Sequence, residues 1–245
     1  MSTEWLKIDQ KELEYHLSQY ARPKAYTLEV LDIFKKAGLD QSVKSVLDFG
    51  CGGGAVTNLF AKQYPSITFK GVDINSSYVA LANEKSEPNA TYAVFDLYNE
   101  DDLLALKTER FNCILSFQTL SWLKDYDQFL KLMSVTLPDY CVITSLFYDG
   151  PVEAQIKIKD ITRSMGDINY RESYYNIYSL DLLKSNLEGI GYCIDQAIPF
   201  EIGFDLPKPD DGSMSTYTET LANGKRLQIS GPILMNWFTI IIKKN

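Results

Sequence analysis

The feature that most constrains this chain is a glycine-rich segment, Asp48–Gly54, which reads Asp-Phe-Gly-Cys-Gly-Gly-Gly. It follows an apolar run, residues 43–47, that has the character of a buried strand. It precedes residues 55–61, whose apolar side chains recur at helical spacing. A ligand can approach bare backbone at such a turn, because glycine has no Cβ, and the free N–H groups of the next helix then point at it. The pattern predicts an α/β domain with a ligand site at this turn.

Two classes of cofactor bind at turns of this kind, and the acid before the glycines separates them. Gly50, Gly52 and Ala55 fit the relaxed dinucleotide pattern G-x-G-x-x-G/A. Asp48 lies two residues before the first glycine, and Gly54 adds a glycine at the next alternate position. A carboxylate at this place would repel a pyrophosphate, whereas it is compatible with a cationic ligand. This argues against a nicotinamide-dependent oxidoreductase, which stays the alternative.

The pattern Asp48-x-Gly50-x-Gly52-x-Gly54 resembles motif I of class I S-adenosylmethionine (SAM)-dependent methyltransferases. The resemblance covers residues 43–147 well and the rest in outline. It implies SAM as the cofactor, which carries a sulfonium and an ammonium but no pyrophosphate. Together with Cys51, the motif residues are expected to line the cofactor site.

Further cofactor residues are expected at the ends of the second and third strands. Asp73 ends a strand about 20 residues after Gly50, the spacing of a ribose-binding carboxylate. In the methyltransferase family, an acid at the end of the third strand binds the adenine amino group, and the next backbone N–H contacts the ring. Asp96 and Leu97 match these two positions, and Ile74 is expected to pack on the adenine.

The fourth strand runs into Ser116, Phe117 and Gln118, which we expect to face the cofactor, because ligands of open α/β sheets bind at the carboxyl ends of the strands. A serine at the strand end and a tryptophan six residues later resemble the small-molecule methyltransferases related to trans-aconitate and malonyl-carrier-protein methyltransferases. Trp122 is that tryptophan here. It is either a core anchor for the next helix or an acceptor-site residue, and it can be both.

The N-terminal region predicts two helices, residues 9–20 and 24–37, separated by a proline. In the resembling family, such helices cover the methyl donor. Tyr15 or Tyr20 could close over the sulfonium, and Arg22 could meet the methionine carboxylate. The single histidine of the chain, on the first helix, is expected to be a surface or packing residue, and no catalytic base is named.

Two further segments, residues 148–178 and 201–232, exceed what a minimal fold needs and are expected to cover the acceptor site. The first is rich in tyrosine, and aromatic walls suit a small, largely apolar acceptor. Tyr174 and Tyr175, with Tyr15 and Trp122, are the candidate acceptor-binding residues, although each could simply pack the cover. The second contains two strand-like runs around Asn-Gly, which predicts a hairpin. Since donor and acceptor sites fall in different segments, we expect their binding to be separable.

Strands that alternate with helices predict a mostly parallel sheet. Ser179 is the expected N-cap of a helix that stops near Gly189. The family resemblance adds an antiparallel last strand between strands five and six, and so a Rossmann-like, doubly wound α/β fold with a seven-stranded sheet. A single domain, residues 1–245, would comprise a helical cap (1–40), a SAM-binding core (41–147) and the two cover segments. The remaining expected strands are 68–73, 92–95, 111–115, 140–147, 192–200 and 235–243.

Composition indicates which classes of binding partner to expect. The net charge is −8, from 24 basic and 32 acidic residues, which disfavours a nucleic-acid partner. No stretch approaches 18 consecutive apolar residues, so no membrane partner is expected, and the first residues do not form a signal peptide. The four cysteines are far apart and predict neither a metal site nor a disulfide framework, which suits a reducing cytoplasm.

The sequence therefore predicts a cytoplasmic SAM-dependent methyltransferase that methylates O or N of a small-molecule acceptor. Methylation of a protein or carrier-bound group is one alternative, and a SAM-binding protein without turnover is another. The acceptor, the methylated atom and the oligomeric state stay open.

Overall fold

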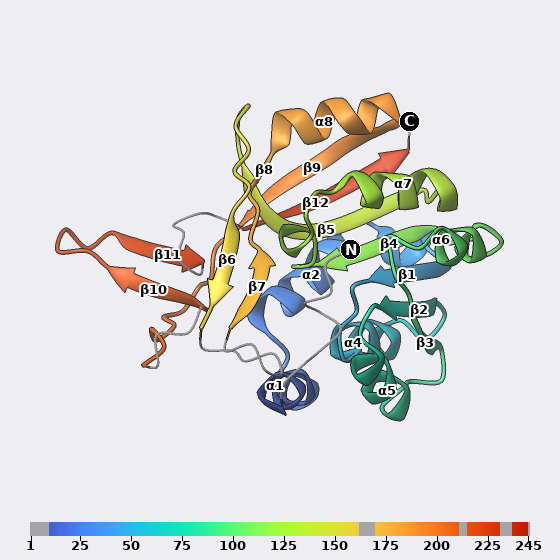
Figure 1. The fold of residues 1–245 in the computed structure, drawn as a ribbon, viewed down its shortest axis with the longest axis horizontal. Coiled ribbons are helices and arrows are strands. Elements are labelled where there is room, and N and C mark those ends of the chain that lie inside the picture. The colour runs from blue at the N-terminus through green and yellow to red at the C-terminus, as the bar shows by residue number, and fades with distance from the viewer. Residues whose placement is uncertain (1–9, 162–169, 211–214, 231–236, 245) are drawn as a thin grey trace.

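In the computed structural model, which describes residues 10–161, 170–210, 215–230 and 237–244, one central sheet organises the chain. Its strand order is β3-β2-β1-β4-β5-β12-β9, and short β8 (Tyr178–Ser179) pairs with the end of β5 (Figure 1). The predicted fold class is confirmed, with seven strands along the main path. The strands are β1 (Ser45–Phe49), β2 (Thr68–Asp73), β3 (Ala90–Val94), β4 (Cys113–Phe117), β5 (Tyr140–Tyr148), β9 (Tyr192–Phe200) and β12 (Trp237–Lys244).

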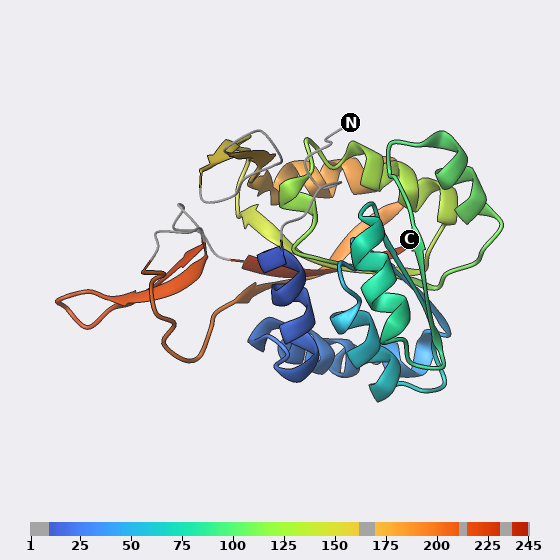
Figure 2. The same ribbon diagram turned by 60° about the horizontal axis from the view of Figure 1, so that its bottom comes forward.

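Helices cover both faces of the sheet, as Figure 2 shows. Side chains alternate along a strand, so successive residues of β1 lie on opposite faces of the sheet. Val46 belongs to the apolar cluster that contains side chains of α2, α4 and α5, and Leu47 belongs to the cluster that contains side chains of α6, α7 and α8. Short α3 and the 3₁₀ helix η2 complete the connections. The helices are α2 (Ala25–Lys36), α3 (Leu39–Ser42), α4 (Ala55–Gln63), α5 (Ser76–Glu84), α6 (Glu100–Lys107), η2 (Leu120–Trp122), α7 (Asp127–Thr136) and α8 (Leu180–Gly189).

Side-chain caps fix where several of these helices begin. The Asn75 side chain accepts hydrogen bonds from the N–H groups of Ser77 and Tyr78, so α5 begins directly after β2. Ser179 caps α8 by accepting from the Leu182 N–H, and α8 ends at Gly189, both as predicted. The sequence analysis had not assigned α5 or α6, whose polar residues obscure the helical pattern.

The last strand is antiparallel and lies between β5 and β9, as the family resemblance implied. Ile240 pairs with Ile143 of β5 and with Ala197 of β9, and it is fully buried. A strand with neighbours on both sides and helices over both faces is buried along its length, and residues 238–242 are all buried: four are apolar, and Thr239 is the one polar residue among them. The first two residues of the predicted strand, 235 and 236, lie outside the described residues.

Three additions extend this core. Helix α1 (Gln10–Ala21) lies across the ends of α4 and α5. The first cover segment contains an antiparallel pair, β6 (Lys157–Asp160) and β7 (Arg171–Tyr174), which the sequence analysis did not predict. The second forms the predicted hairpin, β10 (Thr216–Thr220) and β11 (Arg226–Ser230), which projects from the sheet (Figure 1).

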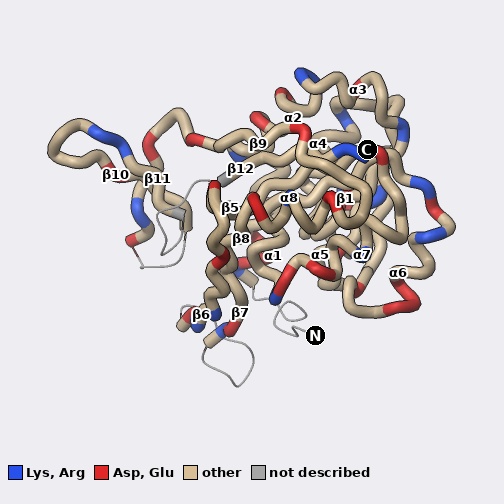
Figure 3. Tube along the Cα trace, turned by 90° about the horizontal axis from the view of Figure 1, so that it is seen from above, with Lys and Arg blue, Asp and Glu red and all other residues tan. Residues whose placement is uncertain are grey.

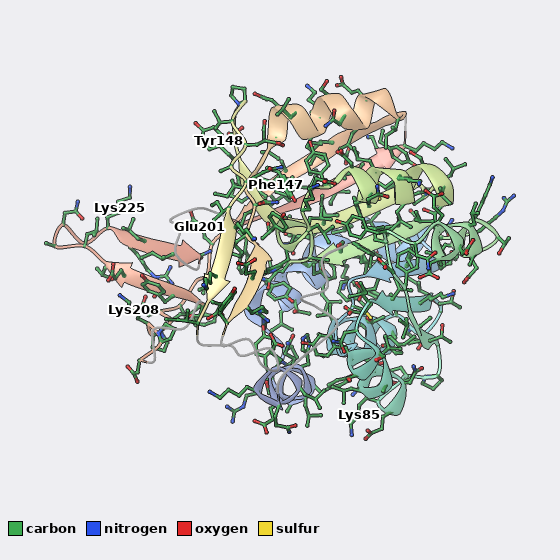
Figure 4. The ribbon with its side chains drawn as sticks, in the orientation of Figure 1. Lys85, Phe147, Tyr148, Glu201, Lys208 and Lys225 are labelled. Carbon is green, nitrogen blue, oxygen red and sulfur yellow. The ribbon has the colours of Figure 1, made fainter. Side chains whose placement is uncertain are left out.

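Basic side chains do not form a continuous surface in the described part of the chain. Figure 3 shows Lys and Arg interspersed with Asp and Glu over the helices and both hairpins. In Figure 4, Lys208 and Lys225 lie on the side of the β10–β11 hairpin, at the opposite end of the molecule from Lys85.

Candidate functional site

A cavity of about 1140 Å³ lies at the carboxyl ends of the sheet strands. It is larger than the roughly 300–1,000 Å³ of a typical ligand pocket, so it has room for more than one small molecule. Its walls come from the ends of β1 to β4, from α1 and the start of α2, and from the cover. The strand-end residues are Asp48, Phe49, Gly50, Cys51, Gly52, Asp73, Ile74, Phe95, Asp96, Leu97, Phe117, Gln118 and Thr119.

The glycine turn closes the end of β1. Gly50 and Cys51 donate their N–H groups to the Val72 carbonyl, at 2.9 and 3.1 Å, which ties the turn to β2. Gly52 has a φ of +53°, and a Cβ there would lie 2.6 Å from the His16 ring. Gly54 serves packing instead: it does not line the cavity, and a Cβ on it would lie 2.6 Å from Ala82. Only glycine suits either position.

Helix α1 is seated directly on this turn. The Tyr20 hydroxyl donates to the Gly53 carbonyl at 2.7 Å and accepts from the Asn58 side chain at 2.9 Å. The His16 Nδ1 accepts from the Gly53 N–H at 3.3 Å, and its ring lies 4.2 Å from that of Tyr78. Burial lowers the pKa of His16 to about 4, so the ring is neutral at pH 7 and can act as this acceptor. The expected surface or packing histidine is therefore a wall of the site.

Asp48 is buried beneath the turn and only 2% exposed. The Thr57 hydroxyl, from the first turn of α4, donates to its Oδ2 at 2.5 Å. Burial raises the pKa of Asp48 to about 7, with a smaller contribution from the nearby negative charge of Asp73, while the Thr57 bond opposes the rise. The site therefore holds an acid that is half protonated near neutral pH.

The ends of β2 and β3 each present an acid to the cavity. Asp73 accepts hydrogen bonds from the N–H groups of Gly52 and Asn75, both at 2.9 Å. Burial raises its pKa, and these backbone bonds oppose the rise. Asp96 accepts from the Tyr98 N–H at 2.9 Å and also lines the cavity, beside the apolar Leu97. Carboxylates with oxygen lone pairs directed at one cavity can receive hydroxyl or amino donors.

The β4 end presents only part of what was expected. Phe117 and Gln118 line the cavity, and Gln118 has a φ of +57° while its N–H donates to the Thr144 carbonyl at 2.8 Å. Ser116 is not among the residues that line the cavity. Its side chain is fully buried, and its hydroxyl donates to the Phe49 carbonyl at 3.0 Å.

The acceptor side of the cavity is aromatic and aliphatic. Trp122 and Tyr175 both line it, with ring centroids 4.8 Å apart. Tyr174, a neighbour of Tyr175 on β7, does not line it, and neither does Tyr20 of α1, whereas Tyr15 and Arg22 do. Ile202, Phe204 and Leu206 also line the cavity and lie in the predicted cover segment 201–232, although the sequence analysis did not name them. Other wall residues that it did not name, for which no local motif existed, are Pro23, Lys24, Ala25, Tyr26, Leu123 and Phe200.

A buried ion pair joins α1 to the cover. Arg171 of β7 and Glu12 of α1 are hydrogen-bonded, their side chains are 8% and 11% exposed, and both line the cavity. The helix that seats on the glycine turn is thereby bound to the segment that forms the acceptor wall. The expected separation of donor and acceptor binding gains no support from this arrangement, since one helix contributes to both.

The comparisons with known proteins agree with this geometry. A family profile described as a methyltransferase domain matches residues 18–197, most of the chain. This chain belongs to the methyltransferase domain family. Its class I fold and its family make SAM the cofactor of this methyltransferase, and the cavity at the glycine turn fits that ligand. The cysteines of the described residues are all free, and these residues contain no group of three or more metal-ligating side chains.

The methyltransferase resembles curated relatives over part of their length. A malonyl-[acyl-carrier protein] O-methyltransferase of Acetivibrio thermocellus is 28% identical over 130 residues, 48% of this chain and 42% of that protein. A ubiquinone biosynthesis O-methyltransferase of Coxiella burnetii is 31% identical over 91 residues, 36% of each chain. The match thus spans less than half the length of these relatives.

Solved structures share the fold over nearly the whole chain. A SAM-dependent methyltransferase of Clostridium acetobutylicum aligns with a TM-score of 0.58 and 12% identity, over 97% of this chain and all of the other. Magnesium protoporphyrin IX methyltransferase of Synechocystis, solved with bound S-adenosylhomocysteine (SAH), aligns with a TM-score of 0.52 and 11% identity, over 98% and 89% of the two chains. No helix among the described residues has the length and apolar character that crossing a membrane requires.

Asp48 should make the stability of the free methyltransferase depend on pH. The pKa of Asp48 is about 7 in the folded state, which exceeds the unfolded value. Its contribution to the free energy of unfolding is therefore full below about pH 4 and is lost as the pH rises through 7. We expect the free energy of unfolding of the wild type, relative to Asp48→Asn, to fall by at most about 1.4 kcal/mol per pH unit between pH 4 and 7. Urea denaturation of both proteins across this range measures it. Parallel pH profiles would contradict the prediction.

Arg171→Met should weaken SAH binding although Arg171 lies in the acceptor cover. The variant leaves Glu12 buried without this ion pair, which we expect to lower the free energy of unfolding by about 3 kcal/mol and to loosen α1 from the glycine turn. Denaturation and calorimetry with SAH measure both effects. Arg226→Met is the matched control, because its pair with Asp205 is exposed and should contribute less than about 1 kcal/mol. Equal effects of the two variants would refute the coupling.

Proposed function

We propose that this methyltransferase transfers the methyl group of SAM to an oxygen of a small or carrier-bound acceptor held in the aromatic part of the cavity. The single observation that carries the proposal is the continuity of the cavity from the glycine turn to the Trp122–Tyr175 wall. Oxygen is favoured over nitrogen because both curated relatives are named O-methyltransferases.

The donor roles follow the chemistry of each cavity wall. We assign Asp73 to the ribose hydroxyls, Asp96 to the adenine amino group, and Ile74 and Leu97 to the faces of the adenine ring. The cradle fits, because Gly50 and Gly52 both line the cavity and neither carries a Cβ. Arg22 lines the cavity and stays a candidate for the methionine carboxylate, and Asp48 lies beneath the turn, where a nearby cationic ligand would favour its ionised form.

The protein's contribution to the reaction is orientation and exclusion of water. When bound, SAM would supply a methyl group on a positively charged sulfur for transfer to an acceptor oxygen, with SAH as the other product; a carboxylate acceptor has no proton to lose. Helix α1 and the cover form two walls of the cavity, and in this proposal they orient donor and acceptor and limit the access of water. His16 uses Nδ1 to accept from Gly53, so it is held in a structural role instead of one as a base.

Asp73→Asn should weaken SAH binding while the fold persists. The variant keeps one acceptor oxygen but removes the charge, and a charge-assisted hydrogen bond contributes about 1.5–3 kcal/mol, so we expect roughly a 10- to 100-fold loss of affinity. Calorimetry measures it. Glu84→Gln, on the exposed surface of α5, is the control. Unchanged affinity in Asp73→Asn would place the ribose elsewhere.

The acceptor class is testable by SAH release. We expect purified protein with SAM to methylate a member of a panel of carboxylic acids, phenols and acyl-carrier-bound carboxylates. Transfer to carrier-bound groups alone would favour the carrier-bound reading over the small-molecule one. Tight SAH binding without release from any acceptor in the panel would favour a SAM-binding protein without turnover.

A further inference from the structure

The cavity contains a lysine whose charge has no counter-ion in the described part of the chain. Lys24 lies between α1 and α2, and its side chain lines the cavity. Its Nζ is hydrogen-bonded to the Tyr15 hydroxyl, and it lies 4.5 Å from the centroid of the Tyr15 ring and 5.6 Å from that of Tyr26. Two electron-rich rings favour the ammonium form, but neither replaces an anion.

The carboxylates that share the cavity have other partners or positions. Asp48 accepts from Thr57, Asp73 and Asp96 accept from backbone N–H groups, Glu12 pairs with Arg171, and Asp160 lies opposite Arg171 in the β6–β7 pair. No ion pair between described residues includes Lys24. Burial lowers the pKa of Lys24 to about 8, so at neutral pH the group is mostly charged but poorly solvated. A partly buried ammonium of this kind gains most from a bound anion.

We propose that Lys24 and the Tyr15 hydroxyl form a carboxylate-binding subsite of the cavity. One ammonium N–H is donated to the Tyr15 oxygen, which leaves two ammonium donors and the phenol O–H for the two oxygens of a carboxylate, and Tyr26 provides an apolar wall beside them. The inference rests on the proposed function for its ligands, SAM and an acceptor.

The carboxylate can come from either ligand. Tyr15 is packed edge-on against His16, which covers the glycine turn, so the methionine part of the donor is within the reach of this wall. Tyr26 packs in the same apolar cluster as Trp122 and Tyr175, so an acceptor carboxylate is the other source. The subsite lies where these two parts of the cavity meet.

Calorimetry with two donor analogues separates the sources. SAH carries the methionine carboxylate, and 5′-methylthioadenosine lacks the whole amino-acid part. If the donor supplies the carboxylate, Lys24→Met should weaken SAH binding at least about tenfold and leave 5′-methylthioadenosine unchanged, and Lys24→Arg should restore SAH binding. Lys62→Met, on the exposed side of α4, is the control.

Benzoate, a carboxylate on an apolar ring, tests the acceptor source. If the acceptor supplies the carboxylate, benzoate should bind the SAH-saturated wild type, and Lys24→Met should lose at least about tenfold in benzoate affinity with SAH affinity unchanged. If the wild type does not bind SAH, the proposed function is refuted but the subsite is not. In that case benzoate is titrated into the protein without SAH.

The pH dependence has a defined sign. The charged amine is the binding form, and the guanidinium of Lys24→Arg stays charged. The ratio of the wild-type carboxylate affinity to that of Lys24→Arg should therefore be constant below pH 8 and fall as the pH rises above it. The other charged or titratable groups that line this part of the cavity are common to all variants: Glu12, Tyr15, His16, Arg22, Tyr26 and Asp48.

The outcomes decide the proposal. Loss of SAH or benzoate affinity in Lys24→Met, with rescue by Lys24→Arg, supports the subsite and identifies the source. The proposal is overturned if Lys24→Met binds SAH and benzoate with the affinities of the wild type. It is also overturned if the wild type binds neither carboxylate.

Discussion

The turn between β1 and α4 is the constraint on which the rest of this methyltransferase depends. Its backbone is bonded on three sides: to the Val72 carbonyl of β2, to the carboxylate of Asp73, and to Tyr20 and His16 of α1. These contacts require positive φ angles and close approaches that only glycine permits. The same turn therefore lines the cavity and also provides the contacts that hold α1 in place.

Helix α1 connects the two halves of the proposed reaction. It touches the glycine turn through Tyr20 and His16, and it reaches the cover through the buried pair of Glu12 and Arg171. Breaking such a pair leaves a charge in an apolar setting, so the two ends are held together more firmly than surface contacts would hold them. Donor binding and acceptor enclosure are thus properties of one connected wall, which is consistent with a reaction that needs alignment more than it needs a catalytic side chain.

Burial shifts the pKa values of three titratable groups that line the cavity. Asp48 and His16 are pushed toward their neutral forms, and Lys24 is left charged but without a carboxylate among the described residues. A cationic ligand at the turn would favour the ionised form of Asp48, and Lys24 offers a positive charge at the junction of α1 and α2. A ligand that carries one cationic and one anionic group can match both residues.

The sequence by itself determined most strands of the central sheet, the glycine turn and the acids at the ends of β2 and β3, because these depend on local periodicity and on spacing along the chain, but it did not predict α5, α6, β6 or β7. It also predicted the hairpin at Asn223 and the cap at Ser179, which are local turn chemistry. Only the tertiary structure decided that the Ser116 hydroxyl bonds to the Phe49 carbonyl, that His16 contacts the glycine turn, and that Glu12 meets Arg171, 159 residues away along the chain. Such contacts depend on how α1 and the cover pack across the sheet edge, and a linear pattern carries no information on the distance between segments that far apart.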